Sequence, residues 1–381
     1  MQKKLKVATI VGTRPELIRL SRVLAVFEEC FEHVLIHTGQ NYDFELSEIF
    51  FRDLKIKKPE YFLNAAGSSG CETVGNVIFK TDEVLRKEMP DAVLILGDTN
   101  SCMAAYSAKR NKIPVFHMEA GNRCFDQRVP EEINRKIVDH ISDMNLTYSS
   151  IAREYLLAEG VLSDRIIKTG SPMFEVLTYN MKAIEASKAL EECNLRPREY
   201  VLVSAHREEN IDGKNGIENL SNILNEIAKR ENIPVFVSTH PRTRKKFEEK
   251  NIALHRGVVL SKPCGFFDFN WLQMNAKYVL SDSGTITEES SILNFPALNI
   301  RDAHERPEGM EEASVMMVGL NIERVFQGIE ILKRQKVGVK RNFLPVEDYQ
   351  NPNVSEKVAR IVLSYIDYVN RKIWLKNPSV T

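Results

Sequence analysis

Residues 92–101 read Ala-Val-Leu-Ile-Leu-Gly-Asp-Thr-Asn-Ser, an apolar run followed at once by a glycine and a polar cluster. A short apolar run bounded by turn residues is typical of a buried parallel strand. Gly97 and Asp98 then mark the end of the strand and the start of a loop. Ligands of open α/β sheets bind beyond the carboxyl ends of the strands, so Asp98 is a candidate site residue.

The same pattern recurs along the chain and predicts two parallel sheets. Apolar runs alternate with amphipathic stretches, which is the arrangement of right-handed βαβ units. Two series of runs predict two Rossmann-like halves. The expected strands are 6–11, 33–37, 92–96 and 114–117 in the first half, and 200–204, 234–238, 258–260, 278–281 and 297–300 in the second. The expected helices include 15–27, 101–110, 131–140, 217–229 and 354–374.

The chain of 381 residues is long enough for two domains. We expect an α/β fold with a first Rossmann-like domain over 1–172 and a second over 173–353. The last segment, 354–381, should contribute a helix that packs back across one of the halves. Polar clusters follow the strands of both halves, so we expect a cleft between the two domains on which these clusters converge.

Composition excludes several classes of protein. Lys plus Arg and Asp plus Glu both number 52, so the formal net charge is zero, which argues against a nucleic-acid partner. The six cysteines form no Cys-x-x-Cys pair, so no metal site is expected, and scattered thiols suit a reducing compartment. The apolar run near the N-terminus is too short for a signal peptide, and no stretch is long enough to span a membrane. We therefore expect a cytoplasmic protein without a membrane partner.

The turn after the expected strand 278–281 is a candidate anion site. Ser283 and Gly284 lie at a strand-to-helix turn, where free backbone N–H groups and the helix dipole favour a phosphate. Glu289 follows about two turns later, where a carboxylate can accept hydrogen bonds from a ribose diol. The alternative interpretation is simple helix capping by Ser283.

One basic residue follows the first strand of each half. Arg14, in Gly-Thr-Arg-Pro-Glu, offers a bidentate fork to a diphosphate, and His206 can neutralise a leaving phosphate. The alternatives are a solvated surface arginine and a structural histidine. Neither Gly-x-Gly-x-x-Gly nor a P-loop motif is present, so neither a dinucleotide cofactor nor ATP-driven phosphoryl transfer is expected.

Three carboxylates follow successive elements of the first half, namely Asp98, Glu119 and Glu131. Carboxylates that share a cleft repel one another, so at least one of them can hold a proton near neutral pH. Such a set supplies a general base and a general acid. The alternatives are an Asx turn at Asp98 and a favourable helix N-terminus at Glu131, behind Pro130.

Taken together, the motifs resemble those of the non-hydrolysing UDP-N-acetylglucosamine 2-epimerases. The similar segments are 12–19, 38–40, 97–99, 118–123, 129–135, 205–210, 281–284 and 301–308. The resemblance implies the glycosyltransferase-B fold, a homodimer, a UDP-sugar substrate, and no cofactor or metal. It also implies inversion at C2 of a UDP-linked 2-acetamido sugar. A base removes the C2 proton while UDP leaves C1, and UDP then adds back to the resulting 2-acetamidoglycal.

The resemblance also assigns roles to individual residues. It implies that the catalytic residues are Asp98, Glu119, Glu131 and His206. It implies that the substrate and its UDP are bound by Arg14, Arg19, Arg135, Ser283, Gly284, Glu289 and Arg301.

Within the family, the chain is most similar to the branch that makes UDP-N-acetyl-L-fucosamine for capsule and O-antigen synthesis. The glucosamine enzymes typically have other residues at Asn41, Asn122, Cys124 and Thr285. We therefore expect conversion of UDP-2-acetamido-2,6-dideoxy-L-talose to UDP-N-acetyl-L-fucosamine. One alternative is a UDP-N-acetylglucosamine 2-epimerase that makes UDP-N-acetylmannosamine, and Asn41 puts the allosteric site of the bacterial glucosamine enzymes in doubt. A more distant alternative is a glycosyltransferase of the same fold.

Overall fold

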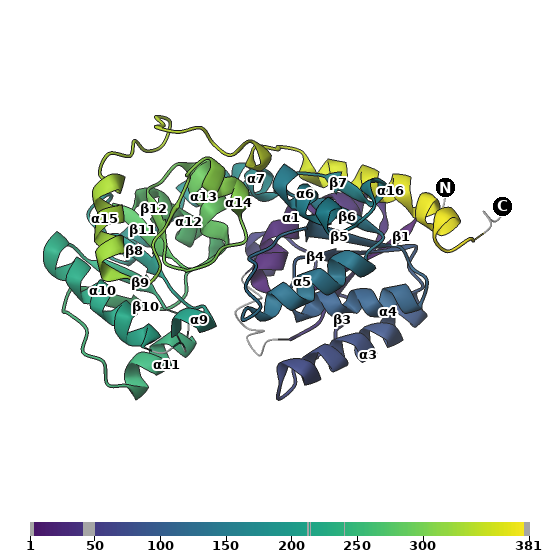
Figure 1. Ribbon diagram of the computed structural model, residues 1–381, viewed down its shortest axis with the longest axis horizontal. Coiled ribbons are helices and arrows are strands. Elements are labelled where there is room, and N and C mark those ends of the chain that lie inside the picture. The colour runs from purple at the N-terminus through teal and green to yellow at the C-terminus, as the bar shows by residue number, and fades with distance from the viewer. Residues whose placement is uncertain (1–3, 41–49, 212, 214, 240, 377–381) are drawn as a thin grey trace. The chain divides into compact units, whose positions relative to one another are not determined.

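The computed structural model describes residues 4–40, 50–211, 213, 215–239 and 241–376. The chain divides into two compact units, which are described one at a time. Unit 1 comprises residues 1–176 and 350–381, and unit 2 comprises residues 177–349. The sequence placed the corresponding boundaries after residues 172 and 353. The predicted α/β class with two parallel sheets is confirmed (Figure 1).

The sheet of unit 1 has seven strands, β1 (Lys6–Val11), β2 (Glu32–His37), β3 (Tyr61–Phe62), β4 (Ala92–Leu96), β5 (Val115–Ala120), β6 (Met144–Thr147) and β7 (Ile166–Lys168). Their order is β3-β2-β1-β4-β5-β6-β7, and all neighbours are parallel. The order reverses between β1 and β4, which makes their carboxyl ends the topological switch point. The loops that carry Arg14 and Asp98 therefore start side by side.

The sheet of unit 2 has six strands, β8 (Val201–Ser204), β9 (Val235–Ser238), β10 (Val258–Ser261), β11 (Tyr278–Ser281), β12 (Ala297–Asn299) and β13 (Met316–Met317). Their order is β10-β9-β8-β11-β12-β13, again parallel throughout. Here the switch point lies between β8 and β11, and the two loops that start there carry His206 and Ser283.

Helices connect the strands in both units. Unit 1 contains α1 (Arg14–Cys30), α3 (Gly70–Glu88), α4 (Ala104–Arg110), α5 (Pro130–Ile141), α6 (Ser150–Ala158) and α16 (Val354–Lys372). Unit 2 contains α8 (Ala189–Glu192), α9 (Glu208–Ile211), α10 (Gly216–Glu231), α11 (Pro241–Glu249), α12 (Phe266–Asn275), α13 (Thr285–Leu293), α14 (Pro307–Glu311) and α15 (Ile322–Leu332). α7 (Met173–Glu185) contains the boundary between the units. Short 3₁₀ turns occur at Asn100–Met103, Ser163–Arg165 and Glu347–Tyr349.

The structure differs from the sequence-based elements in two places that bear on the site. The expected helix 101–110 begins as the 3₁₀ turn Asn100–Met103 and becomes α-helical only at Ala104. The expected strand 114–117 continues to Ala120, so Glu119 is part of β5. The pairing register of β5 with β6 shifts between Met118 and Ala120, which marks a bulge at Glu119.

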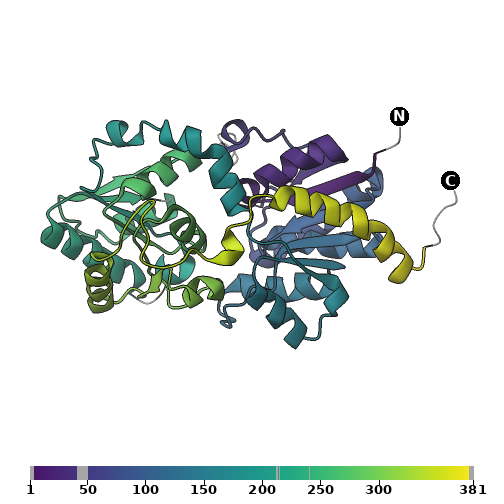
Figure 2. The same cartoon turned by 90° about the horizontal axis from the view of Figure 1, so that it is seen from above.

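The last helix of the chain, α16, packs against α1 in unit 1, as Figure 2 shows. Its buried residues include Val358, Val362, Ile366 and Val369, which recur every three or four positions and so form one apolar stripe. The helix therefore completes unit 1, although it lies far from the rest of that unit in the sequence.

None of the helices in the described part of the chain is both long enough and apolar enough to cross a membrane.

Replacing Ile366 with alanine should lower the free energy of unfolding of unit 1 by about 2–5 kcal/mol, because it leaves a cavity on the buried face of α16. Ile366 is 3% exposed, whereas Leu363 on the same helix is 59% exposed. The control Leu363→Ala should change the same free energy by less than about 0.5 kcal/mol. Urea unfolding can be followed through Trp374 in a Trp271→Phe background, since the chain has 2 tryptophans. Equal losses in the two variants would contradict this packing.

Candidate active site

Three loops of unit 1 approach one another at Gly12, directly after β1. A Cβ atom at Gly12 would lie 1.9 Å from Ser101 Oγ and 2.3 Å from Thr38 Oγ1. The hydroxyl groups of Thr38 and Ser101 are themselves 2.7 Å apart. Only glycine fits at this position, because the ends of β1, β2 and β4 lie too close together for a side chain.

Glu16, in the first turn of α1, ties two of these loops together. Its Oε2 accepts hydrogen bonds from the backbone N–H groups of Gly12 (2.5 Å) and Thr13 (3.2 Å). Its Oε1 accepts a hydrogen bond from Thr99 Oγ1 (2.5 Å), in the loop after β4. The side chain is buried, and this burial raises the pKa of Glu16 to about 7, against the lowering effect of these hydrogen bonds. Glu16 was not among the predicted site residues.

Asp98 is held by the first turns of α5. Arg135 donates from Nε (3.0 Å) and Nη2 (2.7 Å) to Oδ2 of Asp98, and from Nη1 to Glu132 Oε2 (2.8 Å). The amide Nδ2 of Asn134 donates to the Asp98 carbonyl oxygen (2.9 Å). Arg135 is buried while Asp98 keeps part of its surface exposed, so the guanidinium orients a carboxylate that stays accessible.

Glu119 lies in the bulge of β5 in a left-handed backbone conformation, with φ at +66°. This conformation costs about 1–2 kcal/mol for a residue with a side chain. Glu119 Oε2 forms an ion pair with Nη1 of Arg19, a residue of α1, and Oε1 accepts a hydrogen bond from Asn122 Nδ2 (3.3 Å). The Arg19 guanidinium lies 5.9 Å from the centre of the Tyr148 ring. A strained backbone with a paired carboxylate is characteristic of a functional position.

The two adjacent glutamates at the start of α5 differ in burial. Glu131 is partly exposed in the first turn, whereas Glu132 is fully buried. Glu132 accepts hydrogen bonds from the backbone N–H groups of Cys124 (3.1 Å) and Phe125 (3.2 Å), and it contacts Arg135. Glu132 therefore shapes the loop before α5. The sequence singled out Glu131 alone, because adjacent acidic residues look alike until the fold shows which one faces inward.

Arg14 is the first residue of α1 and is only partly exposed. Its guanidinium carbon lies 5.7 Å from the centre of the Phe50 ring, within the range of a cation–π contact.

In unit 2, Asp282 organises the loop after β8. Its Oδ2 accepts hydrogen bonds from the backbone N–H groups of His206 (2.9 Å) and Arg207 (2.9 Å) and from Asn210 Nδ2 (3.3 Å). The imidazole Nδ1 of His206 lies 3.3 Å from Asp282 Oδ1. Asp282 is buried, whereas the His206 side chain is 43% exposed and can reach a ligand. The sequence quoted Asp282 only as part of a motif and gave it no role.

The turn that follows Asp282 leads into α13, and Ser283 accepts hydrogen bonds from the first two N–H groups of that helix, those of Thr285 and Ile286. Ser283 Oγ lies 3.0 Å from Thr285 Oγ1 and accepts a weak hydrogen bond from the Thr285 N–H (3.3 Å). The N-cap residue is Gly284, and no side chain caps the helix from that position. A Cβ at Gly284 would meet only Glu305 Oε2, at 3.6 Å. Backbone donors at such a helix start are suited to a phosphate.

Two further predicted residues are buried in unit 2. Glu289 lies in the second turn of α13 and accepts a hydrogen bond from Gln273 Nε2 (2.7 Å). Arg301 is bound through Nη1 to both carboxylate oxygens of Glu305, at 3.0 Å each. Because Glu305 faces Gly284, Arg301 supports the turn from behind.

Within unit 1, the structure thus joins Arg19 to Glu119 and Arg135 to Asp98. Within unit 2, it brings His206 next to the Asp282 turn that carries Ser283. Across the described ranges, no group of three or more histidine, cysteine, aspartate or glutamate residues is placed to hold a metal ion.

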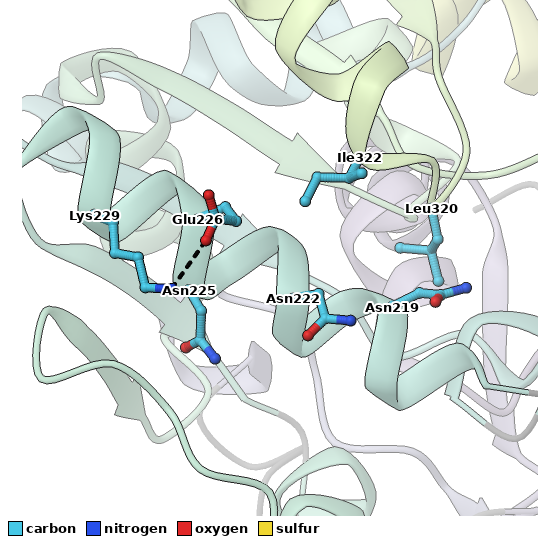
Figure 3. Close-up of a pocket in the computed structure, with 7 residues that line it drawn as sticks. All are labelled: Asn219, Asn222, Asn225, Glu226, Lys229, Leu320 and Ile322. Carbon is cyan, nitrogen blue, oxygen red and sulfur yellow. Dashed lines mark hydrogen bonds and ion pairs between the residues drawn. The ribbon is translucent and has the colours of Figure 1, made fainter.

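A separate pocket of about 310 Å³ runs along α10 and contains none of the predicted site residues (Figure 3). Some of its polar groups are bound within the protein: Asn225 binds the backbone at residues 253 and 255, and Glu226 pairs with Lys229. It is lined by Asn219, Asn222, Asn225, Glu226, Lys229, Leu320 and Ile322.

Comparison with known proteins identifies what the chain is similar to. A family model described as UDP-N-acetylglucosamine 2-epimerase matches residues 26–363. The structure of UDP-N-acetylglucosamine 2-epimerase from Rickettsia bellii is 52% identical, covers 98% of this chain and 100% of its own, and has a TM-score of 0.92. The Methanocaldococcus jannaschii enzyme in complex with UDP-GlcNAc and UDP is 34% identical, covers 95% and 100%, and has a TM-score of 0.87. The UDP-2,3-diacetamido-2,3-dideoxy-D-glucuronate 2-epimerase of Pseudomonas aeruginosa is 33% identical over 83% of this chain and 88% of its own.

The raised pKa of Glu16 predicts a pH dependence of stability. The folded protein holds this proton up to about pH 7, whereas an unfolded glutamate loses it near 4.5. The stability that Glu16 contributes is therefore fully present below pH 4.5 and is lost as pH rises through 7. The difference in unfolding free energy between the natural protein and Glu16→Gln should fall by roughly 3 kcal/mol between pH 4.5 and 8.

Urea unfolding of both proteins at the two pH values measures this difference. Glu72→Gln is the matched control, because Glu72 occupies the same turn of α3 but is exposed, and its hydrogen bonds to Ser68 lower its pKa. The difference in unfolding free energy between Glu72→Gln and the natural protein should stay constant over the same pH range. If the difference in unfolding free energy for Glu16→Gln is also constant between pH 4.5 and 8, the Glu16 carboxyl is ionised throughout that range and the prediction is wrong.

Proposed function

The chain belongs to the UDP-N-acetylglucosamine 2-epimerase family, and we propose that it interconverts UDP-N-acetylglucosamine and UDP-N-acetylmannosamine. A UDP-sugar 2-epimerase is an isomerase that inverts one carbon of the sugar. The observation that carries the proposal is the pair of arginine-bound carboxylates, Asp98 with Arg135 and Glu119 with Arg19, at the ends of adjacent parallel strands. The choice of sugar is supported by the Rickettsia bellii and Methanocaldococcus jannaschii proteins.

The carboxylates of unit 1 carry the proton transfer at C2. The C2–H bond is weakly acidic, so its electrons form the C1=C2 bond of a 2-acetamidoglycal only as the C1–O bond to UDP breaks. Asp98 and Glu119 take up and return the proton, and Glu131 shares the acid, base and orienting roles. Return of the proton to the opposite face, followed by addition of UDP, inverts C2.

Charge on the departing UDP needs cationic groups and hydrogen-bond donors. Arg14 and His206 stabilise the negative charge that grows on the β-phosphate. In unit 2, Ser283 and the N–H groups after Gly284 bind phosphate, and Glu289 accepts hydrogen bonds from the ribose. Arg301 holds Glu305 against this turn.

A second candidate substrate is UDP-2-acetamido-2,6-dideoxy-L-talose, which would give UDP-N-acetyl-L-fucosamine for capsule or O-antigen synthesis. Two positions at which the chain departs from the glucosamine enzymes contact carboxylates of unit 1, one of them the candidate Glu119. Asn122 donates to Glu119, and the thiol of Cys124 lies 3.3 Å from Glu132. A third such position, Asn41, lies outside the described residues. The relatives named above act on other UDP-sugars, so this candidate has the weaker support.

Incubation of the purified protein with each UDP-sugar in deuterated water tests the proposal, with the products followed by NMR. UDP-N-acetylglucosamine should be converted to its C2 epimer, with deuterium at C2 of both sugars. Turnover of the L-talose compound alone would replace the proposal with the second candidate. Sugar transfer to an acceptor with C2 unchanged would indicate a glycosyltransferase, and would contradict both.

We also propose that the chain forms a homodimer through one face of unit 1. Helices α3, α4 and α5 lie next to one another (Figure 1). They carry the exposed apolar side chains Phe79, Tyr106, Ile133 and Ile137. Large apolar side chains gathered on neighbouring helices are typical of a covered surface. A second copy of the chain presents the same face, so a two-fold axis buries both.

Phe79→Glu should weaken this dimer by at least about 30-fold, because it places a charge in the apolar contact. Sedimentation velocity over a concentration series measures the dissociation constant. The control is Leu162→Glu, since Leu162 is similarly exposed elsewhere in unit 1 (59% against 66% for Phe79). A dimer that survives Phe79→Glu unchanged, or a chain that is monomeric throughout, would contradict the proposal.

A further inference from the structure

The carboxylate of Asp139, on α5, contacts residues on both sides of Glu119. Its two oxygens accept the backbone N–H of Gly121, at 3.3 and 3.2 Å. Oδ1 also lies 2.9 Å from Nδ1 of His117. Asp139 thus contacts the residue two positions before Glu119 and the residue two positions after it. These contacts enclose the only segment of β5 with left-handed backbone, which is Glu119 itself.

His117 extends the same connection to the neighbouring loop. Its Nε2 lies 2.8 Å from the carbonyl oxygen of Gly97, at the end of β4. A carbonyl only accepts hydrogen bonds, so Nε2 carries a proton and donates it. Gly97 immediately precedes Asp98. His117 therefore joins the backbone that carries Asp98 to the carboxylate that holds the backbone around Glu119.

Asp139 is itself fixed by an arginine. Arg123 Nη1 donates to Asp139 Oδ2 (2.7 Å), and its Nε and Nη2 donate to the two oxygens of Glu159 (2.7 and 2.5 Å). Arg123 and Asp139 are both buried, so a paired, hydrogen-bonded arrangement is required to keep their charges there. The chain of contacts runs from Glu159, whose side chain is partly exposed, to Gly97.

We propose that Asp139 is a positioning residue for the epimerase reaction. It holds Glu119 in its left-handed conformation and, through His117, fixes the distance between Glu119 and Asp98. Without it, the backbone at Glu119 relaxes toward an ordinary strand, and the Glu119 carboxylate turns away from Arg19. The inference rests on the proposed function, because it assigns Asp139 a part in the same proton transfer.

The chain offers a matched control at the other end of β5. Asp143 is also buried, its Oδ2 accepts the backbone N–H of Val115 (2.9 Å), and it pairs with Lys109. Val115 starts the strand, about 13 Å from Glu119 at the usual rise of a strand. Asp143 therefore stabilises β5 in the same chemical manner but not at the bulge.

The experiment compares Asp139→Asn, Asp139→Ala and Asp143→Asn in steady-state kinetics and in C2 deuterium exchange. The kcat of Asp139→Ala should fall by about 10- to 100-fold, the range expected for a misplaced catalytic group, with KM and UDP affinity within about threefold of the natural protein. Asp139→Asn keeps one acceptor oxygen and should retain more activity than Asp139→Ala. Asp143→Asn should keep its kcat even if its thermal unfolding temperature falls as far as that of Asp139→Asn.

Equal kcat losses in Asp139→Asn and Asp143→Asn at equal loss of stability would overturn the inference and leave a structural role. If Asp139→Ala does not fold, His117→Gln breaks the connection from the other side and keeps a donor for Gly97. It should lower kcat without changing UDP affinity, and an unchanged kcat would again overturn the inference. A natural protein that exchanges C2 of no UDP-sugar would instead overturn the proposed function.

Discussion

Two arginine–carboxylate pairs at the ends of β4 and β5 are the contacts on which the site of unit 1 depends. Arg135 reaches Asp98 from α5, and Arg19 reaches Glu119 from α1, so two helices fix two adjacent strand ends. The sheet places these ends side by side, because β4 and β5 are paired in parallel. In the proposed reaction these carboxylates move a proton at a weakly acidic carbon, and fixing them matters because their distance from the carbon decides the rate.

Unit 2 has the same parallel architecture, but its switch point presents hydrogen-bond donors instead of paired carboxylates. Its switch point lies between β8 and β11, where Asp282 binds the loop of His206 and the turn of Ser283 leads into α13. A buried carboxylate that accepts backbone N–H groups fixes the loop while leaving the imidazole exposed. The result is a set of donors suited to a diphosphate, which in the proposed reaction is the group that leaves when C2 loses its proton.

The sequence was sufficient for the parts of the fold that depend on local pattern, and it named candidate site residues by the same pattern. Apolar runs predicted the central strands, and the polar residues after them marked Asp98, His206 and Ser283. It missed β6, since Asn145 and Thr147 interrupt its apolar pattern although both are buried. It gave no role to Asp139 or Asp282, because a buried carboxylate is recognised only by distant partners: Asp282 binds the backbone of His206, 76 residues earlier.

The role of Asp98 is tested most directly by deuterium exchange at C2 in the Asp98→Asn variant. The affinity of the same variant for UDP is measured by calorimetry. If Asp98 moves the C2 proton while unit 2 binds the nucleotide, exchange should fall by at least about 100-fold. The dissociation constant for UDP should stay within about threefold of the natural value. Exchange at the natural rate in this variant would show that the proton travels through another group, and would contradict the role given to the arginine-bound carboxylates.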